Sequence, residues 1–252
     1  MALAVIGEYK LRLDKYLTEM GIGSRSEVKQ GIKKGFAKVN DTAVTRPEYK
    51  VDDKDIVCWK GTPIHFVEYE YIMLHKPAGV ISATEDTKDR TVLDLIKDAK
   101  RKDLFPVGRL DKNTEGLLLL TNDGDLAHRL LSPKHHVSKT YYAKVDGIMT
   151  EEDIRIFSEG FKVDDALTAL PAKLTILNVK DDTSEIELEI YEGKFHQVKR
   201  MVHAVGKEVV YLKRLSMGSL VLDEQLKPGE YRPLTEHELE GLYAGSHKSR
   251  HI

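Results

Sequence analysis

The sequence holds a single cysteine, Cys58, among 252 residues, so no disulfide can close within the chain. A lone cysteine disfavours a disulfide-built extracellular domain and offers no metal-ligand spacing. Long hydrophobic runs are missing too, since none reaches the roughly 18 residues of a membrane-spanning helix. The first residues also lack the order of a signal peptide. We therefore expect a cytoplasmic protein that does not bind a membrane.

An excess of charge of one sign is also lacking, because 39 basic residues face 41 acidic ones and the formal net charge is −2. That balance alone argues against nucleic-acid binding. The local balance differs. Eight Lys/Arg face three acids from 9 to 38, four face none from 128 to 144, and six face two from 191 to 215. One basic segment of this kind is usual for a solvated surface. Three basic segments in one chain, which flank the candidate site around residue 111, favour an anionic partner.

Apolar residues make up 41% of the chain, enough to bury a sizeable core, and no long internal repeat is visible. Turn residues and composition divide the chain into five parts. We expect a tail or expression scar at 1–10, a small module at 11–60, a linker at 61–68, a larger domain at 69–243 and a second tail at 244–252.

The small module opens with two helical segments. Leucines and a methionine recur at helical spacing from residue 11 until Gly21-Ile22-Gly23 interrupts them. Ser24-Arg25-Ser26-Glu27 is a capping box that begins a second helix, whose apolar face holds Val28, Ile32 and Phe36. Its basic residues fall largely on other faces and can meet phosphates. Short strands are expected around Asn40-Asp41 and at 55–60.

The larger domain mixes strands and helices without the steady alternation of a doubly wound parallel sheet, so we expect an α+β fold. Leu117 to Thr121 is a short continuous apolar run, typical of a central strand buried on both sides. Further strands are expected at 69–74, 173–178 and 183–190, and helices at 125–131, 151–159, 197–205 and 235–243.

Asp111 lies in a polar turn that feeds this apolar strand, with Arg109 before it and Thr114 and Gly116 after it. A cation within a few ångströms would keep the carboxylate ionised, which suits a nucleophile. The alternative is an aspartate that only caps the turn or pairs with Arg109. The residues alone leave both interpretations open.

The segment from Gly108 to Gly124, GRLDKNTEGLLLLTNDG, resembles the signature of the RsuA-type pseudouridine synthases. The resemblance extends to MLHKPAG at 73–79, SPKHH at 132–136 and EGKFHQVKRM at 192–201. The small module resembles an S4 RNA-binding domain through LRLDKYL at 11–17 and SRS at 24–26.

This resemblance implies a small S4-like domain followed by a synthase domain with a central mixed, largely antiparallel sheet. It implies an enzyme that breaks the N-glycosidic bond of a uridine in RNA, turns the uracil and rejoins it through carbon, with no cofactor or metal. Asp111 would be the catalytic aspartate, which attacks the ribose C1′ or the base C6, or abstracts a ribose proton. Because a stacked uridine is out of reach, the base must be flipped into a pocket.

The resemblance also gives roles to other residues. Tyr141 would stack on the flipped base, and neighbouring Tyr142 should then point to the opposite face of an extended segment. Lys199 would pair with Asp111 as a point charge, and Val198 would lie beneath the uracil. Arg109 would either steady Asp111 or fill the gap that the flipped base leaves.

We expect further RNA contacts from basic and polar residues in both parts of the chain. They are Arg12, Lys15, Ser24, Arg25, Lys29, Lys33, Lys134, His135, Lys139, His196, Gln197 and Arg200. The histidines could also suggest a metal site or a general base, but His128, His135, His136, His196 and His203 show no recognised zinc spacing. We therefore expect no metal site.

The target that the resemblance favours is small-subunit (16S) rRNA, because 132–141 and 228–235 are most similar to the RsuA branch. The partner would be rRNA or a partly assembled small ribosomal subunit, bound by a monomer. Large-subunit (23S) rRNA is an alternative, since those synthases share every catalytic motif. A non-catalytic S4-type assembly factor is another. A two-carboxylate glycoside hydrolase is a third, although no partner acid stands out near Asp111.

Overall fold

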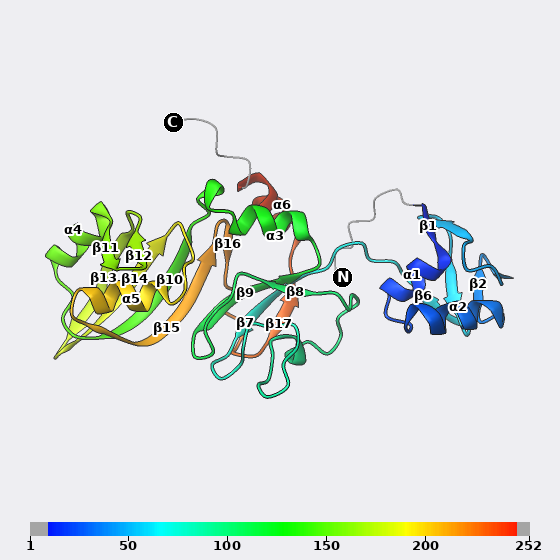
Figure 1. Cartoon of the computed structure of the whole chain (residues 1–252), viewed down its shortest axis with the longest axis horizontal. Coiled ribbons are helices and arrows are strands. Elements are labelled where there is room, and N and C mark those ends of the chain that lie inside the picture. Colours follow the sequence, from blue (N-terminus) through cyan, green and yellow to red (C-terminus); the bar gives the residue numbers. More distant parts are fainter. Residues whose placement is uncertain (1–9, 246–252) are drawn as a thin grey trace.

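The computed structural model describes residues 10–245, which form a small N-terminal module at one end of an elongated molecule and a larger domain beyond it (Figure 1). The tails expected at 1–10 and 244–252 fall mostly outside these residues. Within residues 10–245, no helix is both long enough and apolar enough to cross a membrane.

The N-terminal module packs two helices against short strands. Strand β1 (Lys10–Arg12) pairs with β4 (Lys50–Asp52), and helices α1 (Leu13–Glu19) and α2 (Arg25–Lys33) follow β1. A second sheet has the order β3 (Thr42–Ala43), β2 (Ala37–Val39), β5 (Val57–Trp59) and β6 (Thr62–Ile64). The predicted capping box of α2 is confirmed, because Ser24 and Glu27 exchange both bonds. Asn40 and Asp41 both have positive φ, as a tight hairpin between β2 and β3 requires.

The range 61–68, expected to be a linker, is structured over much of its length. Residues 62–64 form β6, which pairs with β5, and Phe66 is buried against Tyr16 with ring centroids 5.1 Å apart. The glycine and proline of this range mark a hairpin between β5 and β6 and not a linker. Burial of apolar side chains such as Phe66 is the signal that distinguishes the two. We therefore propose that the module extends to about Phe66. Phe36, expected on the apolar face of α2, lies beyond that helix and is exposed.

The larger domain is built on a nine-stranded sheet of order β13-β14-β10-β15-β9-β7-β17, with β8 also on β9 and β16 also on β15. Among the strand pairings described in this sheet, only β9 with β15 is parallel, which confirms the mixed, largely antiparallel α+β fold. The strands are β7 (Tyr71–Lys76), β8 (Phe105–Val107), β9 (Glu115–Thr121), β10 (Lys139–Asp146), β13 (Lys173–Lys180), β14 (Thr183–Ile190), β15 (Glu208–Met217), β16 (Leu220–Val221) and β17 (Tyr231–Pro233). A separate hairpin joins β11 (Phe161–Asp164) and β12 (Leu167–Ala169).

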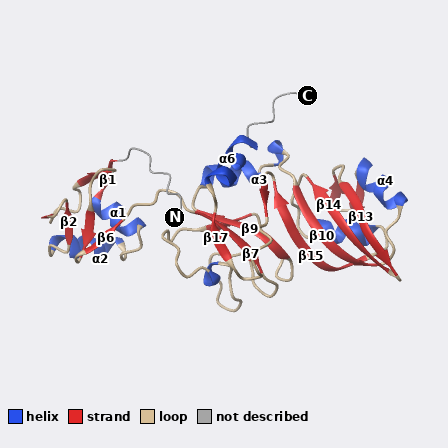
Figure 2. Cartoon of the chain, turned by 180° about the vertical axis from the view of Figure 1, so that it is seen from behind, coloured by secondary structure: helices blue, strands red, loops and turns tan. Residues whose placement is uncertain are grey.

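Helices cover the sheet unevenly. They are α3 (Gly124–Leu131), α4 (Glu151–Glu159), α5 (Gln197–Ala204) and α6 (Glu236–Gly245), with short 3-10 turns η1 (Leu93–Leu95) and η2 (Pro133–His135). Helices α4 and α5 pack on one face of β10, β13, β14 and β15, and Figure 2 shows these strands from the other face, in front of the helices. Helices α3 and α6 cover one face of β7 and β9.

Strand β9 is the central strand that the apolar run predicts. Leu117 and Leu119 face the core beneath α3 and α6, whereas Leu118 and Leu120 face a second core beneath the loop that carries η1. The strand is therefore buried on both sides, as expected. Strand β15, the longest in the sheet, is not among the expected strands, because its apolar residues are interrupted by Lys213 and Arg214.

Gly116 allows β9 and β15 to lie side by side. It has φ of +103°, and a Cβ there would lie 2.2 Å from the backbone oxygen of Arg214. Because no side chain fits, only glycine permits the parallel pairing that joins the two halves of the sheet.

We predict that Gly116→Ala lowers the free energy of unfolding by about 3 kcal/mol or more, because strain from positive φ adds to overlap with the β15 backbone. Gly206→Ala is the matched control, since Gly206 also has positive φ, +79°, but no atom within 4 Å of the added Cβ. Its cost should be about 1–2 kcal/mol. Chemical denaturation of both variants measures the difference, and equal costs would contradict the close approach.

Candidate active site

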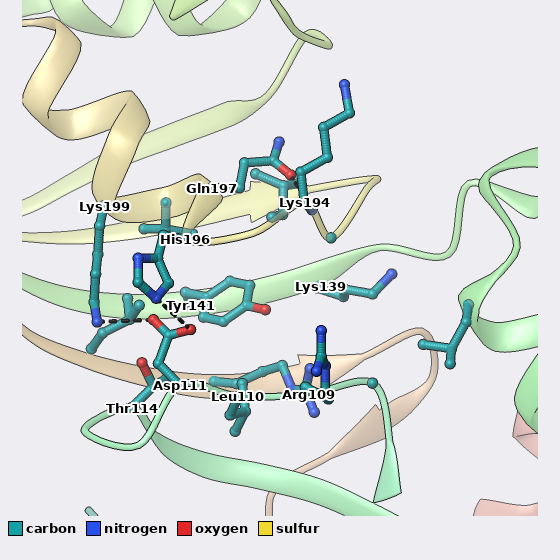
Figure 3. A pocket seen from close by; sticks show the side chains of 17 residues that line it. Arg109, Leu110, Asp111, Thr114, Lys139, Tyr141, Lys194, His196, Gln197 and Lys199 are labelled. Atoms are coloured by element: carbon teal, nitrogen blue, oxygen red, sulfur yellow. Dashed lines mark hydrogen bonds and ion pairs between the residues drawn. The ribbon is translucent and has the colours of Figure 1, made fainter. Parts of the chain in front are cut away.

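Asp111 lies in the turn between β8 and β9, at the floor of a pocket (Figure 3). The pocket wall comes from this turn, from β10 and β15, and from the start of α5. The sheet order places β10 next to β15 and β15 next to β9, so segments about 90 residues apart in sequence meet here. The carboxylate is 26% exposed, so it is accessible to a ligand in the pocket.

A buried lysine holds the Asp111 turn in shape. The Lys76 Nζ lies 3.0 Å from the backbone oxygen of Asp111, 3.1 Å from that of Lys112 and 2.8 Å from that of Thr114, and it also contacts the Pro77 oxygen at 3.1 Å. An ammonium has three hydrogens, so one is shared. Burial lowers the pKa of Lys76 to about 8, against the opposing charges of Asp111 and Glu115. The turn is thus fixed through its backbone, and the Asp111 side chain is left free for chemistry.

Two groups from the start of α5 contact the Asp111 carboxylate. Lys199 Nζ donates to Oδ2 at 2.9 Å, and His196 Nε2 lies 3.4 Å from Oδ1. Figure 3 shows both side chains reaching Asp111 from the same side. His196 has φ of +51° at the N-cap of α5 and stacks on Phe195. That turn points the imidazole at the carboxylate, a contact that the sequence does not predict.

Tyr141 and Tyr142 point to opposite faces of β10. Tyr141 lines the pocket beside Asp111, whereas Tyr142 lies on the other face, where its hydroxyl donates to Glu185 at 2.5 Å. The alternation expected of an extended segment therefore places Tyr141 in the pocket. Buried Leu110, Val198 and Leu212 supply further apolar wall.

Arg109 is exposed at the pocket and forms no ion pair with Asp111 within the described part of the chain. The contacts that would steady the carboxylate come from α5 instead. Arg109 therefore does not pair with Asp111 and is free for the other expected role, which is to fill the gap that the flipped base leaves.

The other pocket residues named from the sequence differ in how free they are. Lys139 is buried and lines the pocket, and it donates to the Val137 oxygen. Gln197 is buried, accepts from the Lys194 amide and donates to Glu192, so it shapes the loop before α5. Arg200 is held by both carboxylate oxygens of Asp164. Lys134 is exposed and His135 half-buried in η2.

In the N-terminal module, several predicted RNA-contacting residues have partners within the protein. Arg12 and Lys29 both pair with the buried carboxylate of Asp14, at 3.0 and 3.9 Å. The others divide into two groups. Lys15 pairs with Glu19 and the Ser24 hydroxyl with Glu27, whereas Arg25 and Lys33 are exposed and, within residues 10–245, form no ion pair.

Two residues of the site have no role in the sequence analysis. Lys76 stands in a quoted motif, but only the structure shows what it holds. Arg214 lines the pocket with its side chain fully buried. An arginine at an inward position of an alternating strand is the signal that points to it, although β15 itself has to be recognised first.

Comparisons with known proteins agree on one family. The family model for RNA pseudouridylate synthase matches residues 70–204, and the S4 domain model matches residues 11–57. Ribosomal large subunit pseudouridine synthase B of Bacillus subtilis is 43% identical over 92% of this chain and 96% of its own length. Ribosomal small subunit pseudouridine synthase A of Vibrio cholerae is 38% identical over 92% of this chain and all of its own.

A solved structure agrees as well. The crystal structure of a pseudouridylate synthase superposes with a TM-score of 0.64 at 38% identity, over 92% of this chain and 99% of the other. The match therefore covers the N-terminal module as well as the larger domain. The chain belongs to the RsuA-type RNA pseudouridine synthases, isomerases with an S4 domain ahead of the catalytic domain.

Proposed function

We propose that the protein converts one uridine of small-subunit (16S) rRNA to pseudouridine, with Asp111 as the catalytic nucleophile. The observation that carries this proposal is the carboxylate of Asp111, partly exposed in a pocket and bonded at 2.9 Å to Lys199. An aspartate that merely capped its turn would use its side chain for backbone amides. Here the backbone of the turn is held by Lys76, and the carboxylate faces the pocket.

The pocket suits a flipped base. Extruding the uridine costs stacking energy, which a flat apolar surface offsets. Tyr141 supplies the aromatic face, and Val198 and Leu212 supply apolar wall. Exposed Arg109 fills the gap in the RNA that the base leaves. Lys199 balances the charge of Asp111 while the glycosidic bond breaks and the base turns.

The small-subunit target is supported by full-length relatives named for that activity. Small subunit synthases A of Vibrio and Haemophilus align over 99–100% of their length at 37–38% identity. The second candidate is large-subunit (23S) rRNA, which the 43% identity to large subunit synthase B of Bacillus subtilis favours. Both candidates use the same catalytic pocket and differ only in the RNA that is bound.

The first prediction from the proposed function concerns the modified position. Pseudouridine mapping of rRNA should find one 16S site that is lost in cells lacking the protein and is restored by the wild type but not by Asp111→Asn. The amide keeps the shape of the carboxylate but is a poor nucleophile. Equal binding of the unmodified RNA by Asp111→Asn is the control for folding. A site in 23S rRNA would establish the second candidate, and full restoration by Asp111→Asn would refute the mechanism.

The second prediction concerns Lys199. Lys199→Met should lower kcat on the order of 100-fold, with little change in RNA affinity, because the ammonium acts on the Asp111 charge during the reaction. Lys199→Arg should keep part of the activity, since it retains the charge but changes its geometry. Single-turnover kinetics with saturating enzyme measures the chemical step. A loss confined to affinity would contradict the pairing.

The third prediction concerns the N-terminal module. Arg25 and Lys33 of α2 and Lys34 at its C-cap are exposed and form no ion pair within residues 10–245. Combined Arg25→Ala, Lys33→Ala and Lys34→Ala should reduce the slope of log K against log salt by about 2, because three unneutralised cations leave the interface. The control is Arg155→Ala with Lys162→Ala, which removes exposed cations that are already paired with acids of the larger domain. An unchanged slope in the triple variant would argue against an RNA-binding role for α2.

A further inference from the structure

Two buried cations share the active-site pocket, on the side away from Lys199. Lys139 of β10 is 6% exposed and Arg214 of β15 is 1% exposed, and both line the pocket. Figure 3 shows Lys139 beyond Tyr141 as seen from Lys199. Arg214 is the cross-strand neighbour of Tyr141, so its side chain starts on the same face of the sheet.

Neither cation has an acidic partner in the part of the chain that the structure describes. Lys139 Nζ donates to the Val137 backbone oxygen at 2.8 Å, and Arg214 Nε donates to that of Leu117, also at 2.8 Å. In residues 10–245, no carboxylate forms an ion pair with either, and Arg214 Nη2 is buried without a hydrogen-bond partner. A buried charge normally has a counter-charge, because removing it from water is costly. This pair therefore lacks the anion that would offset its burial.

Both groups are basic side chains buried at the pocket. Burial lowers the pKa of Lys139 to about 8, and the charge of Arg214 acts in the same direction. A guanidinium stays protonated even when buried. Two positive charges of this kind at one end of a pocket repel each other, and an anion between them removes that repulsion.

We propose that Lys139 and Arg214 form a phosphate-binding subsite, which holds the phosphodiester adjacent to the uridine that is modified. The proposal rests on the proposed function, because it seats that uridine at Asp111. Phosphates are the anions that RNA offers, and an arginine fork with a lysine point charge is a common way to bind them. Lys139 and Tyr141 are two residues apart on one strand, about 7 Å, so one nucleotide can contact both.

Gly108 keeps the way to Arg214 open. It has φ of +72°, and a Cβ there would lie 3.0 Å from Leu131 and 3.7 Å from Arg214 Nη1. A side chain there would press against Leu131 and come into van der Waals contact with the guanidinium. Gly108, in the motif that carries Asp111, therefore lies beside the subsite.

The test uses a short rRNA fragment that carries the mapped uridine, with a neutral methylphosphonate in place of one flanking phosphate. In the wild type, kcat/KM should fall about 10- to 100-fold for the neutral linkage on one side of the uridine, the loss of one charge-assisted contact. Lys139→Met should show a similar loss with normal RNA and no further loss with that neutral linkage. Lys144→Met, an exposed cation on the same strand, is the control and should behave as wild type.

A stability measurement separates this role from a structural one. Lys139→Met keeps the length of the stem and removes the unpaired charge, so its Tm at pH 7 should rise by about 2–4 °C or more. The subsite would be refuted if Lys139→Met and the neutral linkage lowered kcat/KM additively. It would also be refuted if Lys139→Met lost activity and had a lower Tm. If the wild type left the normal fragment unmodified, the proposed function would fail instead, which keeps the two failures distinct.

Discussion

The close approach of β9 and β15 at Gly116 is the constraint on which the candidate active site depends. Without a side chain at this position, the backbone of Arg214 lies against β9, and the sheet runs without a break from β13 to β17. Asp111 stands just before β9, and Arg214 is carried by β15 itself. The contact therefore sets the distance between the Asp111 turn and the two strands, β15 and β10, that form the wall of the pocket. A looser pairing would shift Asp111 away from both Tyr141 and α5.

Charge in the pocket is divided between groups that have internal partners and groups that do not. Lys76 is surrounded by backbone oxygens and Lys199 is bonded to Asp111, so both have partners within the protein. Within residues 10–245, Lys139 and Arg214 each bond to a single carbonyl oxygen. The same division applies in the S4 domain, where buried Asp14 pairs with Arg12 and Lys29, whereas Arg25 and Lys33 form no ion pair with any described residue. A net charge of −2 is therefore compatible with RNA binding, because cations that have no acidic partner among the described residues lie at the pocket and on α2.

Much of the fold follows from local sequence signals. The capping box at Ser24, the hairpin at Asn40-Asp41 and the doubly buried strand β9 are each set by residues close together in sequence, and the structure confirms them. The strand β6 within the expected linker at 61–68 has no local signal of its own, because its partner is β5 and the pairing shows only in the structure. Strand β15 is missed for a related reason, because Arg214 is a residue type usually found at the surface. Its burial becomes clear only once β15 is placed between β9 and β10.

The site shows the same limit. The motif around Asp111 identifies the aspartate, and alternation along β10 selects Tyr141 over Tyr142. The contact between His196 and Asp111 depends on a left-handed residue at the start of α5, which no propensity of histidine predicts. Two of the predicted RNA contacts, Gln197 and Arg200, also have hydrogen-bond partners inside the protein, which the sequence does not show. The sequence motifs therefore indicate which residues gather at the pocket. Which of its cations lack an acidic partner is visible only in the structure, and that is the observation from which we infer the position of the RNA backbone.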